Sequence, residues 1–150
     1  MSYVPLGGPE ETHIIFEREF PAHLDALDVT EQRNPLSKLH TLASSDAPPD
    51  QYVYEQIGTL DIVRFSDAGR LYTKVLTHVP DGNSSYHIVY VLYVDRTHQY
   101  DQGKLGKFSQ QARQKLDTIT DLSSVRRVES YLDEHDSLTA DDLDELLDDG

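Results

Sequence analysis

Residues 51–95 read QYVYEQIGTLDIVRFSDAGRLYTKVLTHVPDGNSSYHIVYVLYVD, and this stretch decides the fold class. Tyr, Val, Ile, Thr and Leu occur here in short runs, a composition typical of β-strands. We predict four strands, near Tyr52–Ile57, Leu60–Phe65, Arg70–Val79 and Tyr86–Val94. The letters PDGNSS between the last two strands contain residues that favour a tight reversal, so these two strands should pair as a hairpin.

The residues before this stretch carry a short strand pattern and then helical patterns. His13–Phe16 is an apolar run suited to a first strand. Phe20, Leu24 and Leu27 follow it at helical spacing. A second helix is predicted over Pro35–Leu42, with the proline tolerated in its first turn.

The residues after the strands are helical in pattern. One amphipathic helix is indicated by apolar residues spaced three and four apart, namely Leu105, Phe108, Ala112, Leu116 and Ile119. This helix should pack on the sheet. Two further helical stretches follow, one with Val125, Val128, Tyr131 and Leu132, the other with Leu143, Leu146 and Leu147. Thr139 is a suitable N-cap for the last helix, whose first turn is acidic.

These patterns predict an α+β fold: β-α-α, followed by an antiparallel sheet of about four strands and then C-terminal helices. A chain of 150 residues has the usual size of one domain. We expect residues 1–11 to form a flexible leader, residues 12–120 the α+β domain, and residues 121–150 an acidic helical C-terminal extension.

The charge is distributed unevenly along the chain. The net charge is −14, which disfavours nucleic acid because phosphate binding is driven by Lys and Arg. The segment from Arg64 to Lys115, however, contains eight Lys or Arg against four Asp, so the rest of the chain carries −18. An acidic chain with few lysines is typical of a halophilic protein, whose acidic surface keeps it in solution. On this interpretation, the overall negative charge reflects a salt-rich environment, and the positive charge of the central stretch reflects function.

The sequence also predicts a cytoplasmic protein. The longest apolar run, about Ile88–Val94, is far shorter than the roughly 20 residues that cross a bilayer. The N-terminus has neither the basic start nor the apolar core of a signal peptide. The absence of cysteine excludes disulfides, thiolate nucleophiles and cysteine-ligated zinc, and it fits a reducing compartment. No P-loop, dinucleotide-binding glycine pattern or metal-ligand spacing is present.

Strand alternation sorts the residues of the third predicted strand onto two faces. Leu71, Thr73, Val75, Thr77 and Val79 form an apolar or small face. The opposite face carries Arg70, Tyr72, Lys74, Leu76 and His78. A surface with cationic and aromatic side chains suits an RNA backbone and its bases. The alternative is an ordinary solvated face that happens to be basic.

A second polar cluster, DRTHQY at residues 95–100, follows the longest apolar strand. Strand ends suit chemistry because a rigid sheet positions side chains that solvent and substrate can still reach. Histidine exchanges protons near neutrality, so His98, between Arg96 and Tyr100, is a candidate general acid or base. Most single histidines have no catalytic role, and we assign five others to packing or to the surface: His13, His23, His40, His87 and His135.

The chain resembles the RelE/ParE superfamily of type II toxins in the order of its elements, β-α-α-β-β-β-α. It also resembles that superfamily in four sequence features: an arginine in DIVRF, another in GRLY, the strand YHIVYVLYV and a His-x-Tyr ending. The resemblance covers about residues 14–119 as a pattern of elements. It implies an endoribonuclease that cuts mRNA, on the ribosome or free, and that an antitoxin protein neutralises. The chain departs from the family in its net acidity, its long hairpin loop and its acidic tail.

The resemblance assigns roles to individual residues. Arg64 and Arg70 would bind the scissile phosphate and stabilise its developing charge, while His98 and Tyr100 would handle protons and orient a base. The RNA 2′-hydroxyl would attack the adjacent phosphorus, leaving a cyclic phosphate and a 5′-hydroxyl, without a metal or other cofactor. Lys74 and His78 match no fixed position of the family, so their roles are inferred from strand alternation alone. The full predicted RNA-binding set is Tyr72, Lys74, His78, Arg96, Lys104 and Lys107.

Two other interpretations remain open. The chain could be a non-catalytic acidic binding protein that mimics nucleic acid or docks on a basic partner, or a small salt-adapted domain with a structural role. The acidic tail, residues 133–150, has nine Asp or Glu and no Lys or Arg. It could be a solvated helix end, or its leucines could dock on the domain while its acids cover the basic face. Convergence of Arg64, Arg70, Lys74, His98 and Tyr100 on one concave surface would favour the enzyme.

Overall fold

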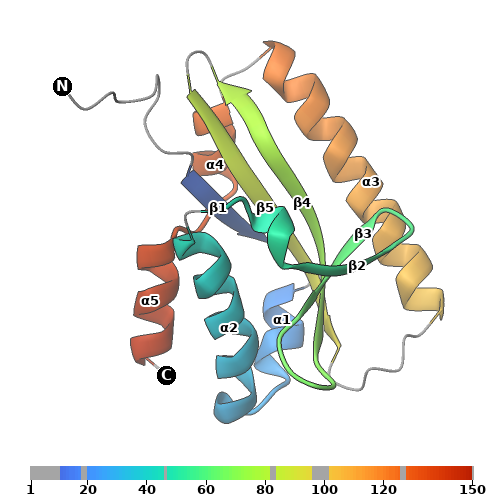
Figure 1. The fold of residues 1–150 in the computed structure, drawn as a ribbon, viewed down its shortest axis with the longest axis vertical. Coiled ribbons are helices and arrows are strands. Elements are labelled where there is room, and N and C mark those ends of the chain that lie inside the picture. The colour runs from blue at the N-terminus through green and yellow to red at the C-terminus, as the bar shows by residue number, and fades with distance from the viewer. Residues whose placement is uncertain are drawn as a thin grey trace.

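The computed structural model describes residues 11–17, 20–45, 47–81, 84–95, 102–125 and 128–149. Its elements in chain order are β1 (Glu11–Phe16), α1 (Phe20–Asp25), α2 (Val29–Ser44), the short 3₁₀ helix η1 (Pro49–Tyr52), β2 (Val53–Ile57), β3 (Leu60–Arg64), β4 (Arg70–Asp81), β5 (Ser84–Asp95), α3 (Gln102–Val125), α4 (Val128–Glu134) and α5 (Ala140–Asp149). The predicted α+β class is confirmed (Figure 1). The four central strands begin and end within two residues of their predicted limits.

The five strands form one sheet in the order β1-β5-β4-β3-β2. The pairs β2–β3, β3–β4 and β4–β5 are antiparallel, and β4 with β5 forms the predicted hairpin. β1 pairs with β5 in parallel, from Glu11 opposite Tyr86 to Phe16 opposite Val91. A parallel pair needs a long connection, which here contains α1, α2 and the first antiparallel strands. The sheet is therefore mostly antiparallel, with one parallel strand at its edge.

Helices cover both faces of the sheet (Figure 1). On one face, α1, α2 and α5 bury a core that includes Phe20, Leu39 and Leu143. On the other face, α3 contributes Phe108 and α4 contributes Tyr131 to two smaller apolar clusters. β5 consequently has a near-continuous apolar run, because both of its faces are buried. α3, the helix that follows β5, packs on the sheet as predicted.

α2 begins six residues earlier than predicted, at Val29 instead of Pro35. Asp28 accepts a hydrogen bond from the Glu31 backbone N–H at 2.8 Å, and the Glu31 side chain accepts one from the Asp28 N–H at 3.3 Å. This reciprocal capping box satisfies backbone donors at the helix start. Pro35 thus lies inside the helix, not in its first turn. The letters DVTE contained this signal.

The acidic C-terminal segment packs on the domain. Leu138 exchanges two backbone hydrogen bonds with Ile14, at 2.7 and 2.8 Å, on the outer side of β1. Leu143 is fully buried in the core beside α2, and the Arg33 side chain donates to the Leu147 carbonyl at 3.2 Å. α5 lies on the α2 side of the sheet, whereas Tyr72 packs under α3 on the other side. The leucines of α5 therefore dock on the domain, as one hypothesis expected. The acidic residues of α5 do not cover the predicted basic face of β4, to which Tyr72 belongs, because α5 lies on the opposite side of the sheet.

No helix in the described part of the chain is both long enough and apolar enough to cross a membrane.

Candidate nucleic-acid interface

Two of the predicted phosphate-binding arginines lie side by side at one end of the sheet. Arg64, the last residue of β3, pairs directly with Arg70, the first residue of β4. The exposed ring of Tyr54 on β2 lies against both, with its centroid 5.7 Å from the Arg64 guanidinium carbon and 5.0 Å from that of Arg70. Both distances are within the range of cation–π attraction. We call Tyr54, Arg64 and Arg70 the Tyr54 cluster.

Arg64 is the accessible cation of this cluster. Its side chain is 46% exposed and makes a 2.8 Å ion pair with Asp67, which is itself fully exposed. Its Nε donates to the Ser66 carbonyl at 3.2 Å. An ion pair between exposed side chains contributes little to stability, so another anion can replace Asp67 at little cost.

Arg70 has a different environment, because it is only 1% exposed. Its Nη1 donates to the carbonyls of Ser66, Asp67 and Gly69, at 3.0, 3.2 and 2.9 Å. These bonds fix the turn between β3 and β4, and the ring of Phe65 fills the space beside Gly69 so closely that a Cβ there would lie 2.4 Å from it. In this conformation the Arg70 guanidinium holds the turn through Nη1 and is almost entirely removed from solvent, and its buried Nε has no hydrogen-bond partner among the described residues.

Tyr72 also lies away from solvent. It is fully buried beneath α3, with its ring 5.3 Å from that of Tyr93 and 6.1 Å from that of Phe108. Its hydroxyl donates to the Asp95 carboxylate at 2.9 Å. The ring therefore presents no face on which an RNA base could stack.

Lys107, another predicted RNA-binding residue, is exposed, and its ammonium lies 5.2 Å from the centre of the Phe108 ring.

Lys74 is held by a buried carboxylate. Its ammonium lies 3.4 Å from the Asp61 carboxylate, which is 4% exposed. Asp61 also accepts hydrogen bonds from the Gln56 side chain at 2.7 Å and the Val75 N–H at 2.8 Å. The cavity of about 580 Å³ beside Lys74 is lined by Asp50 and Glu55 as well as Asp61. Three acids around one lysine make this a poor phosphate site.

His78 does not share the face of Arg70, Tyr72 and Lys74 as alternation predicted. The β4–β5 register shifts between Leu76 and Val79, and His78 has a positive φ of 55°. This bulge inserts one extra residue, so that Val79, not His78, packs with Leu76 in the same apolar cluster. His78 is exposed at the bulge, and its backbone N–H donates to His87 Nδ1 at 3.1 Å.

Four predicted site residues cannot be placed. Arg96, His98 and Tyr100 lie outside the described residues, and so does the side chain of Lys104. The preceding residue, Asp95, is described and pairs with Arg70 across β4 and β5. Of the residues whose convergence would favour an enzyme, Arg64 and Arg70 lie together, whereas Lys74 lies against its own acidic partner. The proton-transfer roles of His98 and Tyr100 remain predictions.

Tyr54 is the member of the cluster that sequence reasoning missed. It is the most exposed of the large hydrophobic residues that the structure describes, at 53%. The β2–β3 register shifts between Val53 and Glu55, so simple alternation cannot assign the side of the sheet on which Tyr54 lies. The available signal was a large aromatic residue in a polar strand, VYEQI, next to the arginine-bearing strand.

Among the described residues, no group of three or more His, Asp or Glu side chains is arranged to hold a metal ion. No family model matches the chain, and no curated protein or solved structure matches it either. The comparisons therefore leave the resemblance to RelE/ParE toxins as a prediction that rests on the residues quoted for it.

Proposed function

We propose that this chain binds single-stranded RNA through Tyr54 and Arg64. The observation that carries the proposal is the exposed Tyr54 ring beside two guanidinium groups, one of which is accessible. A base stacks on an aromatic ring whatever its identity, and an adjacent arginine can neutralise the phosphate that follows. Arg70 holds the turn that positions Arg64, so it supports the surface without contacting the RNA itself.

Binding can be tested by fluorescence anisotropy with a labelled, unstructured RNA at several salt concentrations. Tyr54→Ala should weaken binding by about 1–3 kcal/mol, the usual contribution of one stacked base. Arg64→Ala should reduce the slope of log affinity against log salt by about 0.7, the value for one phosphate contact on a single strand. Arg113→Ala, which removes an exposed arginine from α3, is the control for lost charge.

The proposal fails if the Tyr54→Ala and Arg64→Ala variants bind RNA as tightly as the wild type and the Arg113→Ala control. Equal weakening by Arg64→Ala and Arg113→Ala would also contradict it, because net charge alone would then explain the effect of Arg64. Circular dichroism of each variant shows whether the fold is retained.

At a finer level, we propose that the protein is a RelE-like toxin that cleaves mRNA by attack of the 2′-hydroxyl on the adjacent phosphorus. Arg64 would stabilise the charge on the phosphorane oxygens, and His98 and Tyr100 would supply proton transfer. Induced expression of wild type, Arg64→Ala and His98→Ala in a salt-matched host tests this. Growth arrest with new mRNA 5′ ends, lost in both variants, is the expected result, and co-expression of a neutralising antitoxin should restore growth.

A second candidate is a non-catalytic binding protein, and the environment of Arg70 favours it. An arginine that already donates to three carbonyls does not have the freedom that a phosphate-binding catalytic residue needs. This candidate predicts RNA binding that depends on Tyr54, with intact RNA after long incubation and normal growth on expression. Recovery of a 2′,3′-cyclic phosphate product in the presence of a metal chelator would exclude it.

A further inference from the structure

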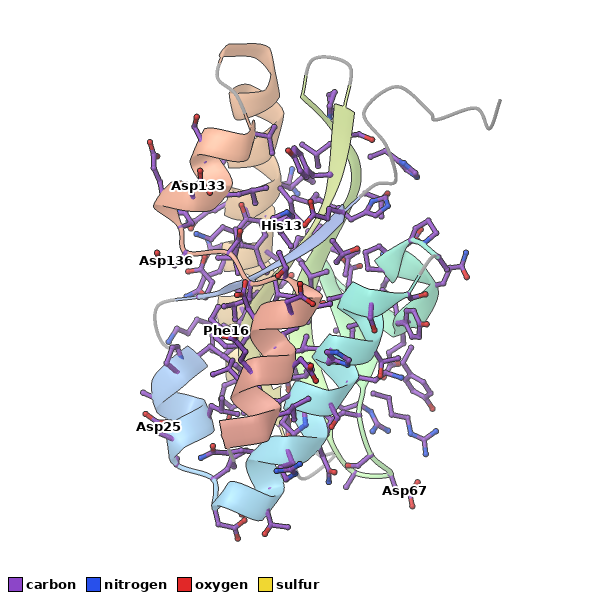
Figure 2. All side chains as sticks on the ribbon, turned by 90° about the vertical axis from the view of Figure 1, so that its left-hand side faces the viewer. His13, Phe16, Asp25, Asp67, Asp133 and Asp136 are labelled. Atoms are coloured by element: carbon purple, nitrogen blue, oxygen red, sulfur yellow. The ribbon has the colours of Figure 1, made fainter. Side chains whose placement is uncertain are left out.

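A second pocket, built from other residues than the Tyr54 cluster, lies where the end of β1 meets β5, α3 and the turn after α4. It has a volume of about 450 Å³, within the range of small-ligand sites. Ile15 and Phe16 are the apolar residues among those that line it. Its polar groups come from four separate segments of the chain, and three features of these groups suit a ligand. Figure 2 shows Phe16 at the end of β1 and Asp136 on the turn after α4.

The first unusual feature is a buried pair of phenols. The hydroxyl oxygens of Tyr90 and Tyr131 lie 2.5 Å apart, and the two residues are 1% and 5% exposed. Two hydroxyls carry two hydrogens, and the bond between them uses one. The other hydrogen has no acceptor among the described residues. Burial and the bond to Tyr131 raise the pKa of Tyr90, so this phenol keeps its proton at neutral pH. The pair thus contributes one unused donor.

The second feature is a lysine fixed at the pocket wall. The Lys115 ammonium pairs with the Glu17 carboxylate and lies 5.5 Å from the centre of the Tyr90 ring. The Lys115 side chain is 29% exposed and that of Glu17 is 19% exposed, so both are partly removed from water. An ammonium has three N–H donors, which leaves donors for a ligand next to the phenol pair.

The third feature is an acidic residue just after the end of α4. Asp136 has a φ of 52°, the left-handed conformation common after a helix end, and the next N–H, that of Ser137, donates to the Leu132 carbonyl as in a helix C-cap. The Asp136 backbone N–H donates to the Asp133 carbonyl at 3.3 Å, and this turn brings Asp136 and His135 to the pocket. The His135 ring packs edge-on against Tyr131 with centroids 4.1 Å apart. The Asp136 carboxylate has no bonding partner within the part of the chain that the structure describes.

We propose that this pocket binds a small zwitterion, a free α-amino acid with an apolar side chain. Its carboxylate accepts the unused phenol hydrogen and an N–H of Lys115, its ammonium pairs with Asp136, and its side chain lies toward Ile15. A simple anion would meet the repulsion of Glu17 and Asp136. A simple cation would leave the buried phenol hydrogen without an acceptor, which costs free energy. Only a ligand with both charges matches all of these groups.

The test compares three probes that share one side chain: L-leucine, 4-methylpentanoate, which lacks the ammonium, and isoamylamine, which lacks the carboxylate. Titration followed by ¹H–¹⁵N NMR gives the affinity of each. L-leucine should bind at least about tenfold more tightly than either analogue, because each analogue loses one charge-assisted contact. Equal affinities of the three probes, or no binding by any of them, would overturn the proposal.

Two variants assign the contacts. The double substitution Tyr90→Phe/Tyr131→Phe removes both hydroxyls but keeps the rings, so no phenol donor remains, and it should weaken L-leucine binding by about tenfold. Asp136→Asn should weaken L-leucine by a similar factor while leaving the affinity for 4-methylpentanoate unchanged or improved. Asp133→Asn is the matched control, since Asp133 is exposed on α4 and does not line the pocket. Unchanged L-leucine binding in Asp136→Asn, with a spectrum that shows a folded protein, contradicts the proposed pairing.

Discussion

Arg64 and Arg70 are opposite each other across β3 and β4, and their environments separate two roles that sequence reasoning had combined. The Arg64 side chain is 46% exposed, whereas Arg70 is 1% exposed and bonded to the turn carbonyls. A guanidinium suits either environment, because its fork of donors can bind phosphate oxygens or backbone carbonyls. The choice depends on whether a neighbouring turn supplies acceptors, and only Arg70 has such a turn.

The first prediction concerns the stability of these two positions. Arg70→Ala should lower the free energy of unfolding by about 3 kcal/mol, because it removes the donor from one buried and two partly buried turn carbonyls. Arg64→Ala should change it by less than about 1 kcal/mol, since its ion pair is exposed. Urea unfolding followed by circular dichroism measures both. Similar small effects at the two positions would contradict the structural role of Arg70.

The second prediction concerns His13, a partly buried residue whose ring nitrogen Nδ1 lies 2.9 Å from the Ser137 hydroxyl. Burial lowers the pKa of His13 below its ordinary 6.5, although Glu11, Asp133 and Asp142 oppose the shift. The unfolded chain therefore takes up a proton at this site at a higher pH than the folded protein does. Stability that is present above pH 6.5 is then lost as the pH falls through the window between the two pKa values.

The measurement for His13 is a comparison of unfolding free energies at about pH 7.5 and about pH 5.5. Wild type should lose more stability over this interval than His13→Gln, which keeps a hydrogen-bonding group but does not titrate. Parallel losses in the two proteins would show that other groups cause the pH dependence.

At the scale of single elements, the hairpin of β4 and β5 shows how one residue alters a strand. Up to Leu76 the alternation follows the predicted pattern, with Tyr72 and Leu76 on the side covered by α3 and α4. The bulge at His78 then shifts the register by one residue and places Val79 in the apolar cluster. A shift of one residue exchanges the two faces of a strand, so the predicted position of His78 was wrong.

The third prediction tests the strain at this bulge. His78→Val should lower the free energy of unfolding by about 1–2 kcal/mol, because a β-branched residue tolerates a positive φ poorly. His78→Gly should be near neutral, since glycine adopts this conformation freely. Both variants retain the backbone N–H that donates to His87. Thermal unfolding gives the comparison, and equal effects of Val and Gly would argue against backbone strain.

At the scale of the whole molecule, the C-terminal segment completes the fold. Leu138 pairs with the outer edge of β1, and Leu143 fills the core between α5 and α2. An uncovered edge strand would expose unpaired N–H and C=O groups, so the Leu138 bridge also protects the first strand. The acidic residues of α5 accompany a buried leucine, and this explains why an acidic segment is kept against the domain.

The fourth prediction compares two leucines of α5. Leu143 is fully buried, and Leu143→Ala should lower the free energy of unfolding by about 2–5 kcal/mol. Leu146 is 41% exposed, and Leu146→Ala should lower it by less than about 1 kcal/mol. Urea unfolding measures both on the same helix with the same chemical change. A small effect at Leu143 would show that α5 does not contribute to the core.

Most helices and strands could be predicted from the sequence alone, because hydrophobic periodicity depends only on neighbours along the chain. The four central strands, the hairpin and the amphipathic helix after β5 follow from such local patterns. The start of α2 was also encoded locally, in the Asp28–Glu31 capping box, although proline suggested a later start.

Which basic and aromatic side chains reach solvent depends on how distant segments of the chain pack together. α3 covers Tyr72, the turn carbonyls hold Arg70, and Asp61 holds Lys74, whereas Tyr54 stays exposed. The same long-range packing brings Tyr90 on β5 against Tyr131 on α4, 41 residues away in the chain. Burial and partner choice depend on contacts between distant segments, and a pattern read along one strand does not contain them.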